Sequence, residues 1–466
     1  MKKMNDNILK ITYVFVGLFA LLAVYLLIYL FTDGKEDINN SYNKRQELLA
    51  EKVVRGTIYS NDMTVLAETQ IDESGNETRV YPYDELFCHV VGSFDMGKYG
   101  LESSYNFDLL TSDASIIEEV VAELNNEKLN GNSIVTTLDI DLQSVCYEAL
   151  GDYDGAVMVM DAKTGDVLAM VSKPDYNPND IAKIWSDIKA EDSGILVNRV
   201  TQGLYPPGSV FKLFTLGEYI DTHRETYQDF LYTCEGIVDL TDFSMKCSNK
   251  KAHGELDLMG AFSKSCNCAF VEIGSKLDSD ALREYCNKKL FNQELPIDIS
   301  YKKSSFTLGS SDSEFVKSQT VIGQGETLVT PIHMCMVMSS IANDGILMKP
   351  RFVEKIIDKN GNTVSTYEPD EYIELYSVED SALLKEYLRE VVNSGTASKL
   401  KSDSYDAYGK TGTAQLSTEG MADSWFVGGV ETESGNVYAI AVVLENVSEN
   451  SSPSIGVTKE ILKHLD

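Results

Sequence analysis

A serine and a lysine stand three residues apart in the stretch "GLYPPGSVFKLFT", residues 203–215. On a helix, Ser209 and Lys212 would lie on one face, so an unprotonated lysine could take the proton of the serine hydroxyl. The next turn is apolar, and burial together with a nearby cation would lower the pKa of Lys212 from about 10.4 toward a value useful to a base. The pair predicts a nucleophile and its general base. The alternative is that Ser209 only caps the helix.

The Ser-x-x-Lys spacing has little value without its context. It also occurs at five other serines, which are Ser41, Ser186, Ser248, Ser300 and Ser398. At Ser209 the preceding "YPPG" forces a non-helical approach to the serine, because proline restricts its own backbone and that of the residue before it. This context favours Ser209 over the other five.

A second candidate element is Ser265-Cys266-Asn267 in "SKSCNCAF". Ser265 and Asn267 form a polar pair within otherwise apolar helical sequence. They could belong to a catalytic site, or they could satisfy each other within the core.

The third candidate is Lys410-Thr411-Gly412-Thr413 in "AYGKTGTAQL". A glycine inside a strand-like run lets another segment approach the backbone closely. Lys-Thr-Gly also occurs at Lys163, but that copy is followed by Asp166 and lies in a predicted hairpin turn. Only the later copy is predicted to lie on a strand that faces a cleft.

The elements that must position these residues begin near Ile134. "GAVMVMDAKTGDVLAMVS" predicts a hairpin of two apolar strands, and "SWFVGGV" with "VYAIAVVLENV" predicts a second one far downstream. The segments between the two hairpins are mostly helical. Strands from both ends with helices between them predict an α+β domain, one antiparallel sheet covered by helices, over residues 135–466. Residues 32–134 predict a small mixed domain.

The N-terminal region predicts one transmembrane helix over residues 11–31, "ITYVFVGLFALLAVYLLIYLF". Lys2, Lys3 and Lys10 precede it and "TDGKED" follows it, which predicts that residues 1–10 are cytoplasmic and that all later residues are extracellular. A cleaved signal peptide is the alternative, but the apolar run is long and no small-x-small cleavage site follows it.

Composition narrows the function classes. The formal net charge of −32 argues against a nucleic-acid partner. The five histidines are scattered without HExxH or CxxC spacing, so no metal site is expected. Eight cysteines in an exported chain permit disulfides. Cys234 and Cys247 are the first candidates for a disulfide, and two buried free thiols are the alternative.

In their order along the chain, the three elements resemble the motif set of penicillin-binding proteins, which is Ser-x-x-Lys, a Ser-Asp-Asn type element and Lys-Thr-Gly. The chain resembles the membrane-anchored, monofunctional class B transpeptidases of that family. The segments "RGTIYSNDMTVLA", "GLESSYNFDL", "TLDIDLQ", "GQGETLVTPIHM" and "SGTASKL" also resemble family segments. In the first of these, residues 60–63 depart from the usual Asp-Arg-Asn-Gly turn. The resemblance implies a serine β-lactamase/transpeptidase-like domain preceded by a pedestal domain.

The resemblance also implies a role for each candidate residue. Ser209 would be the acyl-accepting nucleophile and Lys212 its base, with cationic Lys410 helping to hold Lys212 neutral. Ser265 would relay a proton to the leaving amine. Asn267 would hold the peptide backbone. The terminal carboxylate would bind at Lys410, Thr411, Gly412 and Thr413. The backbone N–H groups of Ser209 and Thr413 would form the oxyanion hole.

The implied reaction is attack on the D-Ala-D-Ala bond of a peptidoglycan stem peptide, followed by acyl transfer to an amine of a neighbouring strand, without a cofactor. β-Lactams would inhibit it. About a hundred residues separate the anchor from the transpeptidase-like region, too few for a glycosyltransferase domain, so by family analogy that enzyme would be a separate membrane partner. The alternatives are a D,D-carboxypeptidase, a β-lactamase, and a non-catalytic β-lactam sensor or divisome scaffold.

Overall fold

The computed structural model describes residues 2–32, 45–191, 194–240, 242–416 and 418–465. Helix α1 (Lys2–Thr32) is the predicted membrane helix. Its stretch Ile8–Leu26 is long and apolar enough to cross a membrane, and none of that stretch is buried against protein. Because the apolar side chains of this stretch do not pack against a protein core, a lipid bilayer is the environment that suits them.

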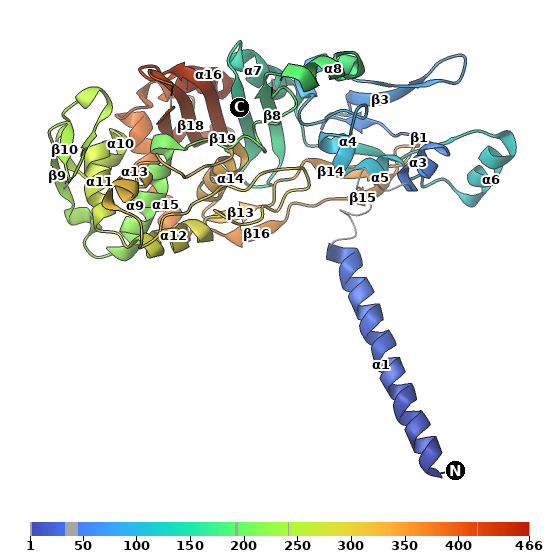
Figure 1. Cartoon of the computed structure of the whole chain (residues 1–466). Helices are drawn as coiled ribbons and strands as arrows, with labels where there is room; N and C mark the ends of the chain where they lie inside the picture. The colour runs from blue at the N-terminus through green and yellow to red at the C-terminus, as the bar shows by residue number, and fades with distance from the viewer. Residues whose placement is uncertain (1, 33–44, 192–193, 241, 417, 466) are drawn as a thin grey trace.

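The C-terminal region is built on a five-stranded antiparallel sheet in the order β17-β18-β19-β7-β8 (Figure 1). Strands β7 (Gly155–Asp161) and β8 (Val167–Lys173) form one predicted hairpin, and β18 (Met421–Thr432) and β19 (Val437–Ser448) form the other. β19 pairs with β7, which joins the two ends of the region. The predicted α+β class with one antiparallel sheet is confirmed, and β17 (Tyr405–Gln415) is an edge strand.

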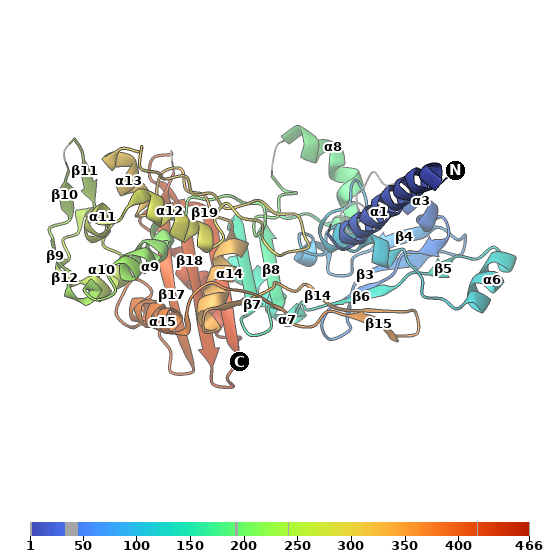
Figure 2. The ribbon, with the colours of Figure 1, turned by 90° about the horizontal axis from the view of Figure 1, so that it is seen from below.

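Helices lie above and below this sheet in Figure 1, and Figure 2 looks onto its lower face. Helix α14 (Pro331–Ala342), of which every residue is buried, packs against β7, β18 and β19. Helices α7 (Ile140–Leu150) and α16 (Pro453–Leu462) pack together on the opposite face, and α15 (Val378–Asn393) packs along β17. Helix α9 (Lys212–Thr222) packs against α11 (Asn267–Ser275) and α12 (Ser279–Lys288), away from the sheet's centre.

The pedestal has its own six-stranded sheet in the order β15-β14-β6-β2-β3-β4. Its N-terminal strands are β2 (Ile58–Tyr59), β3 (Val65–Ile71), β4 (Glu77–Val80) and β6 (Ser133–Thr136). The other two, β14 (Val353–Ile357) and β15 (Thr363–Thr366), come from the later part of the chain. The predicted boundary at residues 134/135 therefore falls inside β6. The division into 32–134 and 135–466 remains a prediction, and two strands of the pedestal sheet lie beyond it.

A buried ion network holds the pedestal sheet to the helices beside it. Both Arg55 Nε and Arg79 Nε donate hydrogen bonds to the Glu102 carboxylate, at 2.6 and 2.7 Å, and all three side chains are almost completely buried. Tyr81 donates a third bond to the same carboxylate. Burial alone would raise the pKa of Glu102, but the two arginines outweigh it and lower that pKa. The network joins the "RGTIY" and "GLESS" segments.

A small lobe of four short strands projects beside α10 and α11. It consists of β9 (Leu231–Cys234), β10 (Ile237–Asp239), β11 (Ser244–Lys246) and β12 (Gly254–Asp257). β12 pairs with β9, and β10 pairs with β11. Only Cys234 and Leu256 are buried on these strands, so the lobe has almost no apolar core of its own.

The segment containing Ser265 is broken, although the sequence predicts it to be helical throughout. Helix α10 (Leu258–Ser263) ends before Ser265, and α11 begins at Asn267. Ser265 has a φ of 54°, a conformation that is rare for residues other than glycine. The break turns the Ser265 carbonyl toward Lys212 Nζ, which donates a hydrogen bond to it at 2.8 Å. If the helix continued through this segment, the Ser265 carbonyl would instead accept a backbone hydrogen bond within the helix.

The remaining described elements are α3 (Arg45–Ala50), β1 (Val53–Val54), η1 (Asp84–Phe87), α4 (Gly100–Ser104), α5 (Asn106–Leu109), α6 (Ile116–Asn125), β5 (Leu129–Asn130), η2 (Pro178–Asp180), α8 (Ile181–Glu191), η4 (Tyr227–Asp229), η5 (Ser248–Lys250), α13 (Glu314–Thr320), β13 (Ile346–Met348), β16 (Glu371–Glu374) and η6 (Ser398–Leu400).

Candidate active site

Ser209 lies in a short 3₁₀ turn, η3 (Gly208–Phe211), that leads directly into α9. The residue before this turn is Pro207, the residue before α9 is Phe211, and neither start has a side-chain capping bond. The Ser209 side chain is partly exposed. Ser209 therefore does not cap α9, which argues against the purely structural alternative.

Two glycines let η3 pack against the edge strand β17. Gly208 has a φ of +54°, and a Cβ on it would lie 2.7 Å from the Thr413 carbonyl oxygen. A Cβ on Gly412 would lie 2.8 Å from the Pro207 carbonyl oxygen. Any side chain at either position would push η3 away from the strand. The expected close approach at Gly412 is confirmed, and it places Ser209 beside the Lys-Thr-Gly segment.

Lys212 is completely buried, and its Nζ turns toward the break between α10 and α11. It donates hydrogen bonds to the Ser265 carbonyl at 2.8 Å, to Asn267 Oδ1 at 2.7 Å and to Ser265 Oγ at 3.2 Å. Its Nζ also lies 5.4 Å from the centre of the Phe270 ring. Within the described residues no hydrogen bond joins Lys212 to Ser209, and catalytic hydrogen bonds are often long before substrate binds.

Lys410 approaches Ser265, which Lys212 also contacts, from the other side. It lies on β17 opposite Val427 of β18 and is also completely buried. Its Nζ donates to Ser265 Oγ at 2.9 Å and lies 5.6 Å from the centre of the Phe262 ring. One hydroxyl therefore lies between two lysines from opposite sides of the site.

The environment of the two lysines disfavours their charged forms. No ion pair joins either one to a carboxylate in the part of the chain that the structure describes. Burial lowers the pKa of Lys212 to about 8. Burial, and then the charge of Lys212, lower the pKa of Lys410 well below its usual value. Two ammonium groups that share one hydroxyl repel each other, so the site favours a state in which one lysine is neutral.

Asn267 connects Lys212 to the small lobe. Its Oδ1 accepts the bond from Lys212, and its Nδ2 donates to the Lys246 carbonyl at the end of β11, at 2.9 Å. One amide hydrogen of Asn267 is left for a ligand, and the residue is partly exposed. The predicted polar pair therefore does not satisfy itself within a core. Both members accept bonds from Lys212, and Ser265 also accepts a bond from Lys410.

The threonines of the third element differ in exposure. Thr411 is buried, and its hydroxyl lies 2.6 Å from the hydroxyl of Thr396. Thr413 is partly exposed, and its carbonyl accepts a long bond of 3.5 Å from Gln324 Nε2. Thr413 is therefore the more exposed of the two threonines and the one more accessible to a ligand in this structure.

The structure brings all of the predicted site residues to one place, at the junction of η3, β17 and the α10–α11 break. The sequence interpretation missed Thr396, Gln324 and the rings of Phe262 and Phe270 that face the lysines. Thr396 and Gln324 belong to the "SGTASKL" and "GQGETLVTPIHM" segments, which carried family resemblance without an assigned role. The two phenylalanines look like ordinary core residues, so the sequence offered no signal for them.

Comparison with known proteins agrees with this geometry. A family model described as the penicillin-binding protein transpeptidase domain matches residues 155–465, which is more than half of the chain. The chain belongs to the penicillin-binding protein transpeptidases. A second model, the penicillin-binding protein A dimerisation domain, matches residues 55–134 of this transpeptidase.

Two curated relatives are peptidoglycan D,D-transpeptidases. MrdA of Acinetobacter baumannii is 28% identical over 431 residues, which cover 79% of this chain and 63% of that protein. PbpA of Mycolicibacterium smegmatis is 26% identical over 426 residues, which cover 86% of each protein. The chain thus spans less than two thirds of MrdA but most of PbpA. Like these two relatives, it is a peptidoglycan D,D-transpeptidase.

Solved structures show the same fold. The D,D-transpeptidase domain of a peptidoglycan glycosyltransferase from Eggerthella lenta has a TM-score of 0.79 at 28% identity and covers 88% of this chain and 98% of that one. Penicillin-binding protein A from M. tuberculosis, solved as an imipenem acyl-enzyme complex, has a TM-score of 0.80 at 23% identity over 89% of this chain and 98% of that one.

Proposed function

We propose that this peptidoglycan D,D-transpeptidase works through an acyl-enzyme on Ser209, with Lys212 as its general base. The observation that supports this assignment is the meeting of two buried lysines, neither with a carboxylate partner, at Ser265 beside a partly exposed Ser209. A buried lysine with a pKa of about 8 is available as a base near neutral pH, whereas an ordinary exposed lysine is not.

In the first half-reaction Ser209 Oγ attacks the carbonyl carbon of the penultimate D-Ala, and its proton passes to Lys212 Nζ. The new C–O bond leaves an oxyanion, which the backbone N–H groups of Ser209 and Thr413 stabilise. The C–N bond to the terminal D-Ala then breaks. Its nitrogen receives a proton through Ser265 Oγ, which is hydrogen-bonded to both lysines. In the second half-reaction an amine of a neighbouring strand attacks the ester carbonyl and forms a new C–N bond. The C–O bond to Ser209 breaks, and the proton that the amine loses restores the Ser209 hydroxyl.

The terminal carboxylate of the stem peptide would bind at β17. Lys410 supplies a positive charge when protonated and Thr413 supplies an exposed hydroxyl, and a cation flanked by hydroxyls suits a carboxylate. Thr411, two residues before Thr413 on the same strand, would complete the carboxylate site, and Gly412 would keep the strand close to η3. Asn267 would use its remaining amide hydrogen for the peptide backbone.

The apolar helix α1 supports a single-pass position in the plasma membrane with the catalytic domain outside. The lysines before the span favour this orientation. This places the site on the side where peptidoglycan lies, and by family analogy a separate membrane glycosyltransferase would supply the glycan strands.

The test is to incubate the full-length protein in detergent with a fluorescent penicillin, map the adduct by peptide mass spectrometry and follow its lifetime. A β-lactam that acylates the relative from M. tuberculosis, imipenem, is the second probe. We expect a long-lived adduct on Ser209 and none in Ser209→Ala. Rapid clearance of the adduct would indicate hydrolysis instead. A folded protein that forms no adduct would support the sensor or scaffold alternative.

A further inference from the structure

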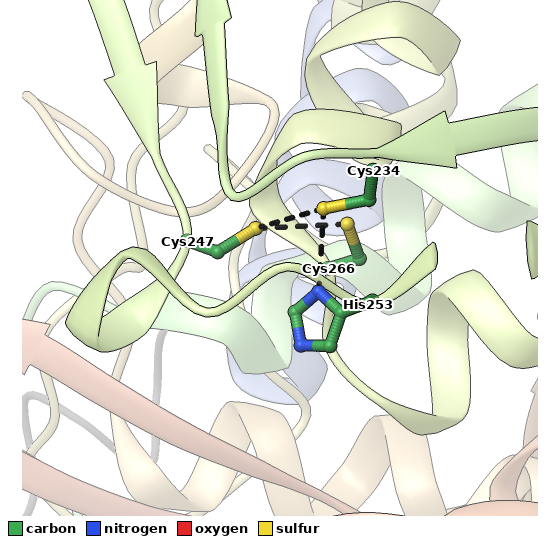
Figure 3. A group of neighbouring side chains, drawn as sticks. All are labelled: Cys234, Cys247, His253 and Cys266. Atoms are coloured by element: carbon green, nitrogen blue, oxygen red, sulfur yellow. Dashed lines mark hydrogen bonds between the residues drawn. The ribbon is translucent and has the colours of Figure 1, made fainter. Parts of the chain in front are cut away.

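Four side chains from four separate positions in the chain converge between the small lobe and α11 (Figure 3). They are Cys234 at the end of β9, Cys247 just after β11, His253 just before β12, and Cys266 between α10 and α11. Their sulfur and ring-nitrogen atoms all lie within 4.8 Å of one another. The three cysteines are buried and His253 is partly buried.

Three of the six distances within this group match the edges of a metal-centred tetrahedron, and all six are within 4.8 Å. With Zn–S bonds of about 2.3 Å and a Zn–N bond of about 2.0–2.1 Å, tetrahedral geometry places two sulfurs about 3.8 Å apart and a sulfur and a nitrogen about 3.5 Å apart. The Cys247 Sγ atom lies 3.7 Å from Cys234 Sγ and 3.6 Å from Cys266 Sγ. The His253 Nδ1 atom lies 3.4 Å from Cys234 Sγ.

We propose that Cys234, Cys247, His253 and Cys266 form a structural zinc site that fixes the turn carrying Ser265 and Asn267. Three thiolates and one imidazole are a common ligand set of structural zinc, and four protein ligands leave no open position for catalysis at the metal.

Backbone groups around the sulfurs suit thiolates. The N–H of Gly236 points at Cys234 Sγ at 3.4 Å, and the N–H of Ala269 points at Cys266 Sγ at 3.4 Å. Cys266 is the residue that caps the N-terminus of α11, where the helix dipole favours a negative charge. These outer contacts would hold the ligands in place and offset the net negative charge of a zinc ion with three thiolates.

The lobe needs a stabilising interaction such as a bound metal, because the burial of its side chains does not stabilise it sufficiently. Its strands are three or four residues long and expose most of their side chains. Small units without an apolar core are commonly stabilised by a metal or by disulfides. Two of the few buried positions here, Cys234 and Cys247, are proposed ligands. A zinc ion would therefore supply the cohesion that the lobe lacks.

The zinc site also bears on the chemistry, because Cys266 is the middle residue of Ser265-Cys266-Asn267. Asn267 in turn donates to the carbonyl of Lys246, the neighbour of Cys247. The metal would thus fix both ends of the contact between the lobe and the lysine-bearing site. Cys266 would be a positioning residue, and this part of the proposal rests on the roles proposed above for Ser265 and Asn267.

Histidine and cysteine spacing in the sequence gave no expectation of a metal. The zinc motifs that can be recognised in sequence place ligands two to five residues apart, whereas the first two ligands here are separated by the whole β10–β11 hairpin. The earlier alternatives for Cys234 and Cys247 were a disulfide or free thiols. The structure has all eight cysteines as free thiols, and the added neighbours His253 and Cys266 favour a metal.

The test uses the full-length protein in detergent, purified without chelators and under reducing conditions, with zinc measured by elemental mass spectrometry. We expect about one zinc ion per chain. Cys234→Ser and His253→Ala should each weaken zinc binding by at least about tenfold, measured by competition with a chromophoric chelator.

Two control variants sharpen the assignment. Cys286→Ala removes a buried thiol on α12 far from the group in sequence and should keep the zinc. Cys268→Ala removes the thiol 3.5 Å from Cys247 Sγ that is not one of the four proposed ligands, and it should also keep the zinc. Loss of zinc in Cys268→Ala alone would overturn the ligand assignment.

A separate readout tests the positioning role. Removing zinc with a chelator should slow acylation by a fluorescent penicillin by at least about tenfold, and adding zinc back should restore the rate. Zinc that binds as expected but leaves acylation unchanged would remove the positioning role and retain the structural site. A disulfide between Cys234 and Cys247, detected by mass spectrometry in protein that binds no added zinc after reduction, would overturn the site itself. The measured zinc content and zinc affinity do not depend on whether Ser209 is the nucleophile.

Discussion

Two pairs of buried cationic side chains among the described residues differ in the group that each pair shares. In the pedestal, Arg55 and Arg79 share the carboxylate of Glu102. In the transpeptidase domain, Lys212 and Lys410 share only the hydroxyl of Ser265. Both pairs are withdrawn from water, but only the first has a counter-ion.

The difference separates a structural device from the proposed catalytic one. Arginine stays charged at any pH that proteins tolerate, and its planar fork matches a carboxylate, so the pedestal network can only hold segments together. Lysine can lose its proton when buried, so a pair without a counter-ion yields a neutral amine near pH 8. In the proposed mechanism, the second pair is useful for chemistry because no described carboxylate pairs with it.

The largest effect is expected from Lys212→Met. Loss of the general base should slow acylation by a fluorescent penicillin by about a hundredfold to ten-thousandfold. The unfolding free energy should change by no more than about 2 kcal/mol, because a buried unpaired cation is replaced by an apolar side chain of similar length. Stopped-flow acylation and urea denaturation measure the two quantities. Normal acylation by this variant would exclude Lys212 as the base.

The reverse pattern is expected from Glu102→Gln in the pedestal. It leaves two buried arginines without their counter-ion and should lower the unfolding free energy by about 3–5 kcal/mol. The acylation rate of the folded protein should stay close to that of the parent. Glu77→Gln, which removes the carboxylate of a half-exposed pair with Lys128, is the matched control and should change stability little. Equal losses from the two variants would contradict a special role for the buried network.

A smaller effect is expected from Thr413→Val, which keeps the shape of the side chain and removes its hydroxyl. Losing one hydrogen bond to a carboxylate should reduce the second-order rate of penicillin capture by about tenfold. The melting temperature should hardly move, since Thr413 is partly exposed and its side chain has no hydrogen bond among the described contacts. If capture and melting temperature fell together, Thr413 would instead have a structural role.

The pH dependence should give the smallest and most diagnostic signal. With a pKa of about 8 for Lys212, the acylation rate should rise through about pH 8 and then level off, as the neutral amine accumulates. Lys212→Met should lack this rise. A rate that is flat between pH 7 and about 9 in the parent would contradict Lys212 as the titrating group.

Stability should show the same lysine with a defined sign. The folded-state pKa of Lys212 is about 8 and its ordinary value is 10.5, so between these values the unfolded chain holds more protons. The parent should therefore gain stability relative to Lys212→Met as pH rises from about 8 to about 10.5, and the difference should be constant below about pH 8. Denaturation curves of both proteins across this range test the sign.

Much of the architecture could be predicted because its signals are local. The apolar run of residues 11–31, the turns at Lys163 and near residue 434, and the strand character around Lys410 each occupy a short window of sequence. Periodicity and turn chemistry act over the same range, so the membrane helix and both hairpins follow from them. The site residues could be selected because their motifs resemble those of a known family, and their catalytic roles remain proposals.

The helix break at Ser265 could not be predicted in this way. Locally, the segment from Leu258 to Ser275 is a reasonable helix, and only the distant Lys212 provides the bond that turns the Ser265 carbonyl outward. The pairing of β14 and β15 with the pedestal sheet has the same character, since the partner strand β6 lies more than two hundred residues earlier. In neither case does the sequence within ten residues of one partner indicate the other partner.

The sequence by itself determined the anchor, the α+β class and the residues on which the chemistry would depend. Only the tertiary structure decided that two lysines share one serine, that Glu102 neutralises two arginines, and that three cysteines and a histidine meet beside Asn267. The physical reason is that propensities and turn preferences are properties of neighbouring residues. Burial, pKa and metal geometry depend instead on groups that folding brings together from distant parts of the chain.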